Sequence, residues 1–434
     1  MTAVVMTREL TRIDRGQMQE SQATGRQPRL RKPRSLASLV AFFLASFFPS
    51  ALSLIGLFLS LWIVIPAPTL FLLPLGVGAP EVSPWLVGMN TIAILLLLRL
   101  LQKSWSSRLF LVCSLVALSL SLLPLLQFPS TNQRFSTAMQ SALGADYLDQ
   151  IPQAQRSMMR PAPLALLDVF RGISDSNIRS RSNVQFAAPD GVALTLNLYQ
   201  PLQKGKYPTI VMIYGGAWQR GTPDSNAVFS RYMAARGYVV VAIDYRHAPQ
   251  YKFPAQLEDI NTAFTHILNH VDDYEIDRDR IAVMGRSSGA HLALLSAFQL
   301  DAPPIKAVVD YYGPVELTIG YREPPSPDPI DSRATLRAFL GGTPDQLPDL
   351  YRQASPYQWV TRPLPSTLLI YGGRDHIVQA KFGKSLFDRL QSVGSRAAFL
   401  EIPWADHAFD AVFNGLSNQL ALYYTERFLG WVLR

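Results

Sequence analysis

The most informative residues are Gly285-Arg286-Ser287-Ser288-Gly289, a G-x-S-x-G pattern. An apolar stretch typical of a buried strand, Arg280–Met284, precedes it, and a helical pattern follows from Ser288. The pattern therefore lies at a strand-to-helix turn, where small glycines allow a sharp bend that lifts the Ser287 hydroxyl above the sheet edge. This arrangement predicts that Ser287 is a nucleophile. Ser288 is the alternative nucleophile, but it lies one residue after the central position of the pattern.

A second glycine-rich turn, Tyr214-Gly215-Gly216-Ala217-Trp218, ends another apolar strand about 70 residues before Ser287. Acyl transfer creates an oxyanion that backbone N–H groups stabilise. Glycine lets those N–H groups approach a substrate closely. We therefore expect the oxyanion hole at Gly215, Gly216 and Ala217, together with the amide of Ser288.

A nucleophilic serine needs a histidine base and an acid that orients it. Of the six histidines, only His407 follows the last strand, 397–402, so we predict that it is the base. Asp375 lies in a glycine-rich loop after the strand 367–371 and is the predicted acid. Asp310, at the end of an earlier strand, is the alternative acid.

A metal site is the competing chemistry. His266 and His270 are four residues apart on a helix, but no Glu follows His266 and no third ligand is evident. The single cysteine, Cys113, excludes a disulfide within the chain and a thiolate cage. We therefore expect no metal and no cofactor.

Strand and helix patterns alternate from about residue 183 to the end. Apolar strands are expected at 209–214, 238–243, 280–284, 305–311, 367–371 and 397–402, with helices at 227–236, 254–270, 288–298, 381–393 and 419–433. Such alternation predicts an α/β domain, 183–434, with a mostly parallel sheet covered by helices on both faces. The segment 316–351 interrupts the pattern, and we expect it to form a cap over the site.

The combined motifs resemble the α/β-hydrolase superfamily. Within it, the chain is similar to esterases related to hormone-sensitive lipase and kynurenine formamidase, the BD-FAE-like carboxylesterases. The family's H-G-G-G-W is represented by residues 214–218, its D-Y-R-L-A-P by 244–249 and its F-P-x-x-x-x-D by 253–259. The chain order Ser, Asp, His also agrees with this fold.

Two positions depart from the family pattern. Tyr214 replaces a histidine that usually braces the loop, and Ala217 replaces the third glycine, which would narrow the oxyanion hole. The resemblance further implies a structural ion pair among Asp244, Arg246 and Asp259.

The resemblance implies a serine hydrolase that cleaves carboxylic esters, small or lipid, through an acyl-enzyme on Ser287. An amidase, arylformamidase or peptidase would use the same three residues and remains an alternative. A non-catalytic binding protein on this fold is a less favoured alternative, because such proteins typically lack one of the three.

The net charge is +8 over 434 residues, of which only 17% are charged and 48% are hydrophobic. Residues 1–35 carry +5, residues 36–127 carry +2, and the remainder carries only +1. The excess of basic residues is therefore confined to the N-terminal third. No basic face is implied for the rest, which argues against a nucleic-acid partner.

The N-terminal third has the composition of a membrane region. Residues 35–80 contain no charged side chain, and two further uncharged runs follow. Since a spanning helix needs about 20 apolar residues, we expect a basic tail at 1–35, spans at about 36–65, 83–101 and 109–127, and a linker at 128–182. The first run would also hold a re-entrant or interfacial stretch. A transporter or channel is expected to carry ionisable residues inside its spans, and the spans expected here contain none.

The basic residues predict the topology. Eight precede the first span, and Lys103 and Arg108 lie between the second and third. Because cytoplasmic loops are enriched in Lys and Arg, we expect the N-terminus in the cytoplasm and the catalytic domain on the opposite side.

Overall fold

The computed structural model describes residues 36–99, 105–173 and 177–434, with side chains from Phe47 onward. The chain divides into two compact units, Met1–Ala51 and Leu52–Arg434. The expected basic tail, 1–35, lies outside the described residues. The features below belong to the second unit unless stated otherwise.

An eight-stranded sheet forms the centre of the α/β domain, in the order β1-β2-β4-β3-β5-β6-β7-β8. The strands are β1 (Arg179–Ala187), β2 (Leu194–Gln200), β3 (Tyr207–Ile213), β4 (Val239–Ile243), β5 (Ile276–Arg286), β6 (Ile305–Tyr311), β7 (Ser366–Gly372) and β8 (Ala397–Ile402). The pairs β1–β2 and β2–β4 are antiparallel, and all others are parallel. The predicted α/β class with a mostly parallel sheet is confirmed.

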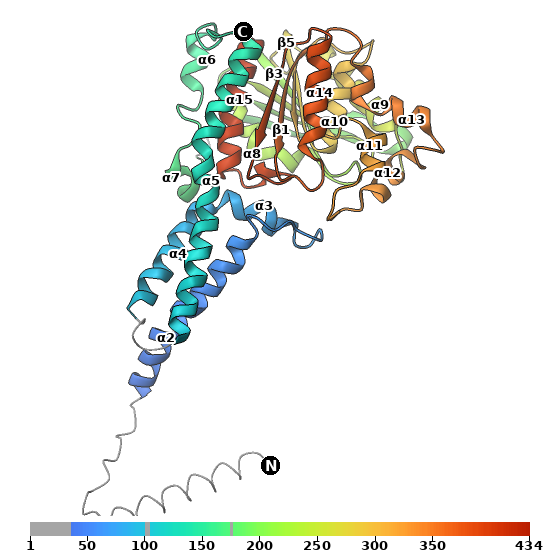
Figure 1. Cartoon of the computed structure of the whole chain (residues 1–434). Helices are drawn as coiled ribbons and strands as arrows, with labels where there is room; N and C mark the ends of the chain where they lie inside the picture. Colours follow the sequence, from blue (N-terminus) through green and yellow to red (C-terminus); the bar gives the residue numbers. More distant parts are fainter. Residues whose placement is uncertain (1–35, 100–104, 174–176) are drawn as a thin grey trace, which may run out of the picture. The chain divides into compact units, whose positions relative to one another are not determined.

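Helices cover both faces of this sheet (Figure 1). One face carries α8 (Ala227–Ala234), α15 (Leu416–Val432) and the end of α5 (Trp105–Leu143), and the other carries α9 (Ala255–Asn269), α10 (Ser288–Phe298) and α14 (Ala380–Ser392). All five residues of β4 are buried, as expected for a strand between two helical layers. Between β6 and β7 lie α11 (Leu317–Arg322), α12 (Ser332–Leu340) and α13 (Pro348–Gln353), in the segment that was expected to form a cap.

The helical part upstream consists of α2 (Leu36–Leu61), α3 (Leu73–Glu81), α4 (Ser83–Leu98) and α5, and it is followed by the short helices α6 (Gln153–Met158) and α7 (Leu166–Arg171). The expected boundary between the third span and the linker, at 127/128, falls inside α5. This helix continues to Leu143, because Phe128, Phe135, Met139 and Leu143 lie on one face and pack into the core of the α/β domain.

Three spans were expected, but the described helices that are long and apolar enough to cross a bilayer are fewer than three. Among the described residues, α5 is the helix that is long and apolar enough to cross a bilayer alone. The pair α3 and α4 meets the same criterion only together, across a bend of 80°. The first expected span lies partly outside the described side chains, and its described apolar part, Phe47–Leu61, is shorter than a span.

Candidate active site

Ser287 occupies the turn between β5 and α10 with a backbone φ of 52°. A non-glycine residue in this left-handed region is strained, and such strain is typical of functional sites. The flanking glycines permit the turn: a Cβ at Gly285 would lie 2.2 Å from the carbonyl oxygen of Gly289, and one at Gly289 would lie 2.3 Å from that of Tyr214. The turn therefore requires glycine at both positions and directs Ser287 out of the sheet edge.

The structure brings Ser287, His407 and Asp375 together at the carboxyl ends of β5, β8 and β7. Nε2 of His407 lies 3.0 Å from Oγ of Ser287, and Nδ1 of His407 lies 2.8 Å from Oδ2 of Asp375. The other carboxylate oxygen of Asp375 accepts hydrogen bonds from the amides of Ile377 and Val378, at 2.8 and 2.7 Å. The acid is thus held in one orientation toward His407.

His407 and Asp375 each shift the pKa of the other. Burial lowers the pKa of His407, but the carboxylates of Asp375, Asp406 and Asp410 together raise it more, so that the net pKa is raised from 6.5. Burial raises the pKa of Asp375, and the neighbouring His407 opposes this. A histidine with a raised pKa is a stronger base, as proton abstraction from a serine hydroxyl requires.

Asp310, the alternative acid, is occupied elsewhere. Its carboxylate accepts hydrogen bonds from the hydroxyl of Tyr371 and the amide of Gly313, both at 2.7 Å. Burial raises the pKa of Asp310 to about 7. Its role is to hold the turn after β6.

The other histidines have structural partners. His266 lies 2.8 Å from the hydroxyl of Tyr274 and stacks on His270. His291, inside α10, accepts a hydrogen bond from the indole of Trp218 at 3.2 Å and donates to the carbonyl of Ala354 at 2.6 Å. Among the described residues, no cluster of ligands suited to a metal ion occurs.

The predicted oxyanion loop has an unusual backbone. Gly216, Ala217 and Trp218 all have positive φ values, of 145°, 56° and 60°. Gly215 approaches the nucleophile turn closely, since a Cβ there would lie 2.5 Å from the carbonyl oxygen of Arg286. The amides of Gly216 and Ala217 have no hydrogen-bond acceptor among the described residues. They are available to a substrate oxygen, as is expected of oxyanion donors.

Tyr214 braces this loop, contrary to the expectation that replacing the family's histidine removes the brace. Its hydroxyl donates to Asp244 at 2.6 Å and lies 2.9 Å from Nε2 of His247. Its ring stacks on Tyr245, whose own hydroxyl donates to the carbonyl of Tyr214. A larger aromatic residue therefore reaches partners at the carboxyl end of β4.

Of the three residues expected to form an ion pair, Arg246 and Asp259 do so. Arg246 lies 2.8 Å from Asp259 and 2.5 Å from Asp190. Asp244 takes no part in it, because its carboxylate is bound to the hydroxyl of Tyr214 and the amide of Tyr245.

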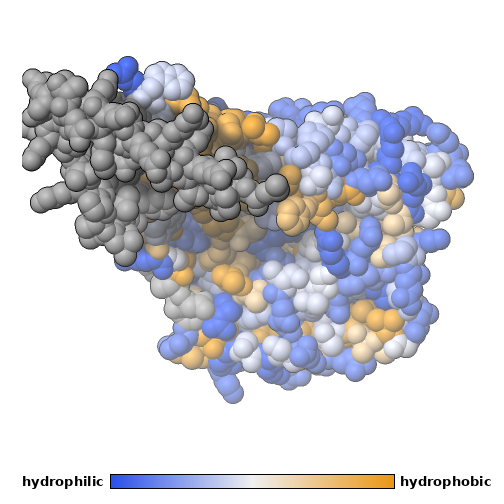
Figure 2. All heavy atoms as spheres, turned by 90° about the horizontal axis from the view of Figure 1, so that it is seen from below, coloured by the Kyte–Doolittle hydropathy of each residue, from blue (hydrophilic) through white to orange (hydrophobic). Residues whose placement is uncertain are grey.

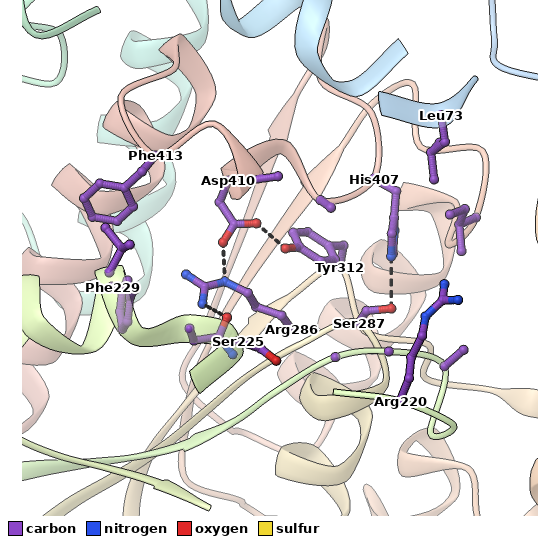
Figure 3. Close-up of a pocket in the computed structure, with 18 of the residues that line it drawn as sticks. Leu73, Arg220, Ser225, Phe229, Arg286, Ser287, Tyr312, His407, Asp410 and Phe413 are labelled. Atoms are coloured by element: carbon purple, nitrogen blue, oxygen red, sulfur yellow. Dashed lines mark hydrogen bonds and ion pairs between the residues drawn. The ribbon is translucent and has the colours of Figure 1, made fainter. Parts of the chain in front are cut away.

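A cavity of about 430 Å³ opens beside Ser287 and His407 (Figure 3). Arg286 forms an ion pair with Asp410 in its wall, and Asp410 also accepts a hydrogen bond from Tyr312. The ring of Tyr312 in turn contacts that of His407, with centroids 4.6 Å apart. Sequence reasoning missed these residues. Arg286 is the first variable position of the G-x-S-x-G motif, but its partner is 124 positions away.

A second, smaller cavity of about 70 Å³ is also lined by Ser287. Pro325, Ile330 and Leu336 of the expected cap contribute to its walls. The cap segment thus borders the site, where it can limit the groups that a substrate places beside Ser287.

The comparisons with known proteins agree with this geometry. Residues 196–390 match the family model described as BD-FAE, a stretch that contains Ser287 and Asp375 and ends before His407. Esterase LipC of Mycobacterium tuberculosis is 35% identical over 219 residues, which cover 47% of this chain and 53% of LipC. The chain thus spans about half the length of LipC.

Two further matches extend the comparison. The probable carboxylic ester hydrolase LipM of the same organism is 25% identical over 321 residues, covering 69% of this chain and 72% of LipM. That share exceeds residues 183–434, so the match reaches into the helical part. The esterase of Pyrobaculum calidifontis has a TM-score of 0.54 at 24% identity, covering 64% of this chain and 90% of the esterase, and shows the fold alone.

The fold, the glycine-rich turns and the esterase relatives point to the same class of protein. The C-terminal part of the chain has the α/β-hydrolase fold, and its sequence is similar to the BD-FAE family and to curated carboxylic ester hydrolases.

Proposed function

We propose that the protein is a membrane-anchored carboxylesterase that forms an acyl-enzyme on Ser287. The observation that carries this proposal is the line of contacts from Asp375 through His407 to Ser287, with both histidine nitrogens at hydrogen-bond distance. Asp375 accepts a hydrogen bond from the N–H group at Nδ1 and so fixes the tautomer in which Nε2 is free to accept a proton.

The geometry supports a two-step reaction. His407 takes the proton of Ser287 as the hydroxyl oxygen attacks the ester carbonyl, and the amides of Gly215, Gly216 or Ala217, with that of Ser288, stabilise the oxyanion. His407 then passes the proton to the departing alcohol, which leaves the acyl group on Ser287. Water, activated by the same histidine, releases the acid and restores the serine.

The test is Ser287→Ala in the full-length protein. Turnover of a short-chain p-nitrophenyl ester should fall by roughly 10⁴-fold or more, because the nucleophile is removed. Labelling by a fluorophosphonate probe should disappear. Ser296→Ala is the matched control, since Ser296 is buried on α10, the helix that follows Ser287, and its hydroxyl donates to the carbonyl of Ala293. Ester turnover in the Ser287 variant close to that of the wild type would reject the assignment, and a matched amide substrate separates esterase from amidase action.

The packing of α2, α4 and α5 supports the membrane anchor. Ser53, Ser60, Asn90 and Ser121 are fully buried between these helices, and Asn90 donates to Ser60 at 3.1 Å. Large apolar side chains such as Val112 point outward instead. This polar-inside, apolar-outside pattern is the reverse of a soluble helical bundle and is typical of helices that pack within lipid.

The topology follows from the positions of the basic residues, and we extend the proposal to it. Arg99 follows α4 and Arg108 lies in the first turn of α5, at the ends of these helices farthest from the catalytic domain (Figure 1). If this end faces the cytoplasm, the catalytic domain lies on the opposite side. Alkaline phosphatase fused to the C-terminus should then be active in a bacterial host, and a fluorescent fusion at the same point should be dark. The opposite result would invert the topology.

A further inference from the structure

The pocket beside Ser287 is not built by the catalytic domain alone. Leu70 and Leu73, from the loop before α3 and the first residue of α3, line the same cavity as Ser287 and His407. In Figure 3 the side chain of Leu73 descends from the ribbon of this segment next to His407. A segment from the uncharged N-terminal run therefore forms one wall of the catalytic pocket.

This wall is fixed to the catalytic domain by specific contacts on both sides of it. Before it, the carbonyl of Val64 accepts a hydrogen bond from Arg374, the residue next to Asp375. After it, the carboxylate of Glu81 accepts one from the amide of Ser417 at 2.8 Å. The segment is therefore part of the folded site.

The direction of α3 places this wall at the membrane surface. The axes of α3 and α4 differ by 80°. Since α4 runs beside α5, α3 would lie nearly parallel to the plane of any bilayer that α5 crosses. It thus has the orientation of an interfacial helix rather than that of a span.

Exposed apolar residues lie in the pocket wall and beside it in the chain. Phe71 is 88% exposed and lies between the two wall residues Leu70 and Leu73 in sequence. Val228, on α8, is also exposed and lines the same cavity. Seen from below, orange atoms gather on the underside next to the helical part, whereas most of the remaining underside is blue or white (Figure 2). Apolar groups exposed together in this way mark a membrane or ligand contact.

We propose that the substrates of this site are amphiphilic esters dissolved in the bilayer, each with at least one long hydrocarbon chain, and that they enter the pocket past Leu70, Phe71 and Leu73. This inference rests on the proposed function. An ester held in the leaflet beside α3 meets an apolar path to Ser287, so its chain need not cross water. The N-terminal segment then acts in substrate selection as well as in anchoring.

The test compares two esters with the full-length protein in phosphatidylcholine vesicles. One is water-soluble p-nitrophenyl acetate, and the other is p-nitrophenyl palmitate incorporated in the vesicles. In Phe71→Ser, the ratio of palmitate to acetate turnover should fall about ten-fold or more, because a large apolar contact with the chain or the lipid is lost. Since Phe71 is almost fully exposed, its replacement removes little packing within the protein.

Leu300→Ser is the matched control. Leu300 is 75% exposed but precedes β6, at the edge of the sheet opposite the site, so the ratio should stay within about two-fold. Leu73→Ala, in the pocket wall, should lower the ratio as Phe71→Ser does. An unchanged ratio in both N-terminal variants, including an equal loss on both esters, would overturn the inference.

The wild-type protein separates this inference from the proposed function. Hydrolysis of the soluble ester without hydrolysis of the vesicle-bound ester would reject only the bilayer route. Absence of both activities, together with absence of fluorophosphonate labelling, would reject the esterase proposal itself.

Discussion

The side chain of Asp406 lies 3.3 Å from Nδ1 of His376 and joins the loop after β8 to the loop after β7. Its Oδ1 also accepts hydrogen bonds from the amides of His376 and His407, at 3.1 and 2.7 Å. One carboxylate thus connects the loop of the candidate acid with that of the candidate base. It fixes their separation without touching the hydroxyl of Ser287.

Asp406→Ala should lower kcat by about ten- to hundred-fold, because a small displacement of His407 misaligns the proton transfer. Asp406→Asn retains an oxygen that can accept from both amides and should lose much less. Steady-state kinetics on a soluble ester measure both. A loss in Asp406→Asn as large as that in Asp406→Ala would show that the negative charge, rather than the tie between the loops, is what matters.

Asp375→Asn should cost about 10⁴-fold in kcat, because the amide cannot hold His407 in the required tautomer. Asp310→Asn, the matched variant, should change kcat only a few-fold, since Asp310 bonds to Tyr371 and Gly313. The reverse pattern of kcat values would make Asp310 the acid.

Asp310→Asn should also alter the pH dependence of stability. Burial raises the pKa of Asp310 from 3.8 to about 7 in the folded protein, so its contribution to stability is complete below pH 4 and is lost as the pH rises through 7. The amide does not titrate. The variant should therefore gain stability relative to the wild type between pH 5 and pH 8, measured as midpoints of urea unfolding. An equal difference at both values would contradict the prediction.

The pH profile of kcat/KM should show an acid limb with an apparent pKa above 6.5. His407 must be neutral to accept a proton, and the neighbouring carboxylates raise its pKa despite burial. Activity should thus rise with pH through this value and then level off. Measured on a soluble ester, a limb below 6.5 would show that burial outweighs these carboxylates.

Ala217→Gly should stabilise the protein by about 0.5 kcal/mol. Ala217 has a φ of 56°, a left-handed conformation that costs a non-glycine residue about 1 kcal/mol. Glycine removes this cost but gains entropy in the unfolded chain. Ala263→Gly, in the middle of α9, is the control and should destabilise by about 1 kcal/mol or more. A loss of stability in Ala217→Gly, by urea unfolding, would mean that the methyl group of Ala217 makes a favourable contact.

The elements that carry Ser287, Asp375 and His407 could be predicted because each follows a buried strand. In a parallel sheet the carboxyl ends of neighbouring strands meet at one edge, so three turns far apart in sequence converge. The spacing of Gly285 and Gly289 also predicted the turn that holds Ser287. These signals are local, and the topology of the sheet supplies the rest.

The partners of Asp244 and Arg286 could not be predicted in this way. Asp244 bonds to the hydroxyl of Tyr214, whose ring stacks on Tyr245, and Arg286 at the end of β5 pairs with Asp410, which follows β8. Such contacts depend on side-chain packing, which sequence spacing does not encode. Leu73 is a different case, because an apolar residue in an uncharged run is suited equally to lipid and to a pocket wall.

The continuity of α5 has a mechanical consequence. A helix of 39 residues is about 58 Å long, and it leads without a break from its apolar half to Met139 in the core of the catalytic domain. A single residue inserted in its apolar half would turn everything downstream by about 100° and raise it by 1.5 Å. The direction in which the pocket faces is thus set by the phase of a helix. Substitutions along α5 leave that phase intact, whereas a one-residue insertion or deletion rotates the mouth of the pocket relative to the apolar half of the helix.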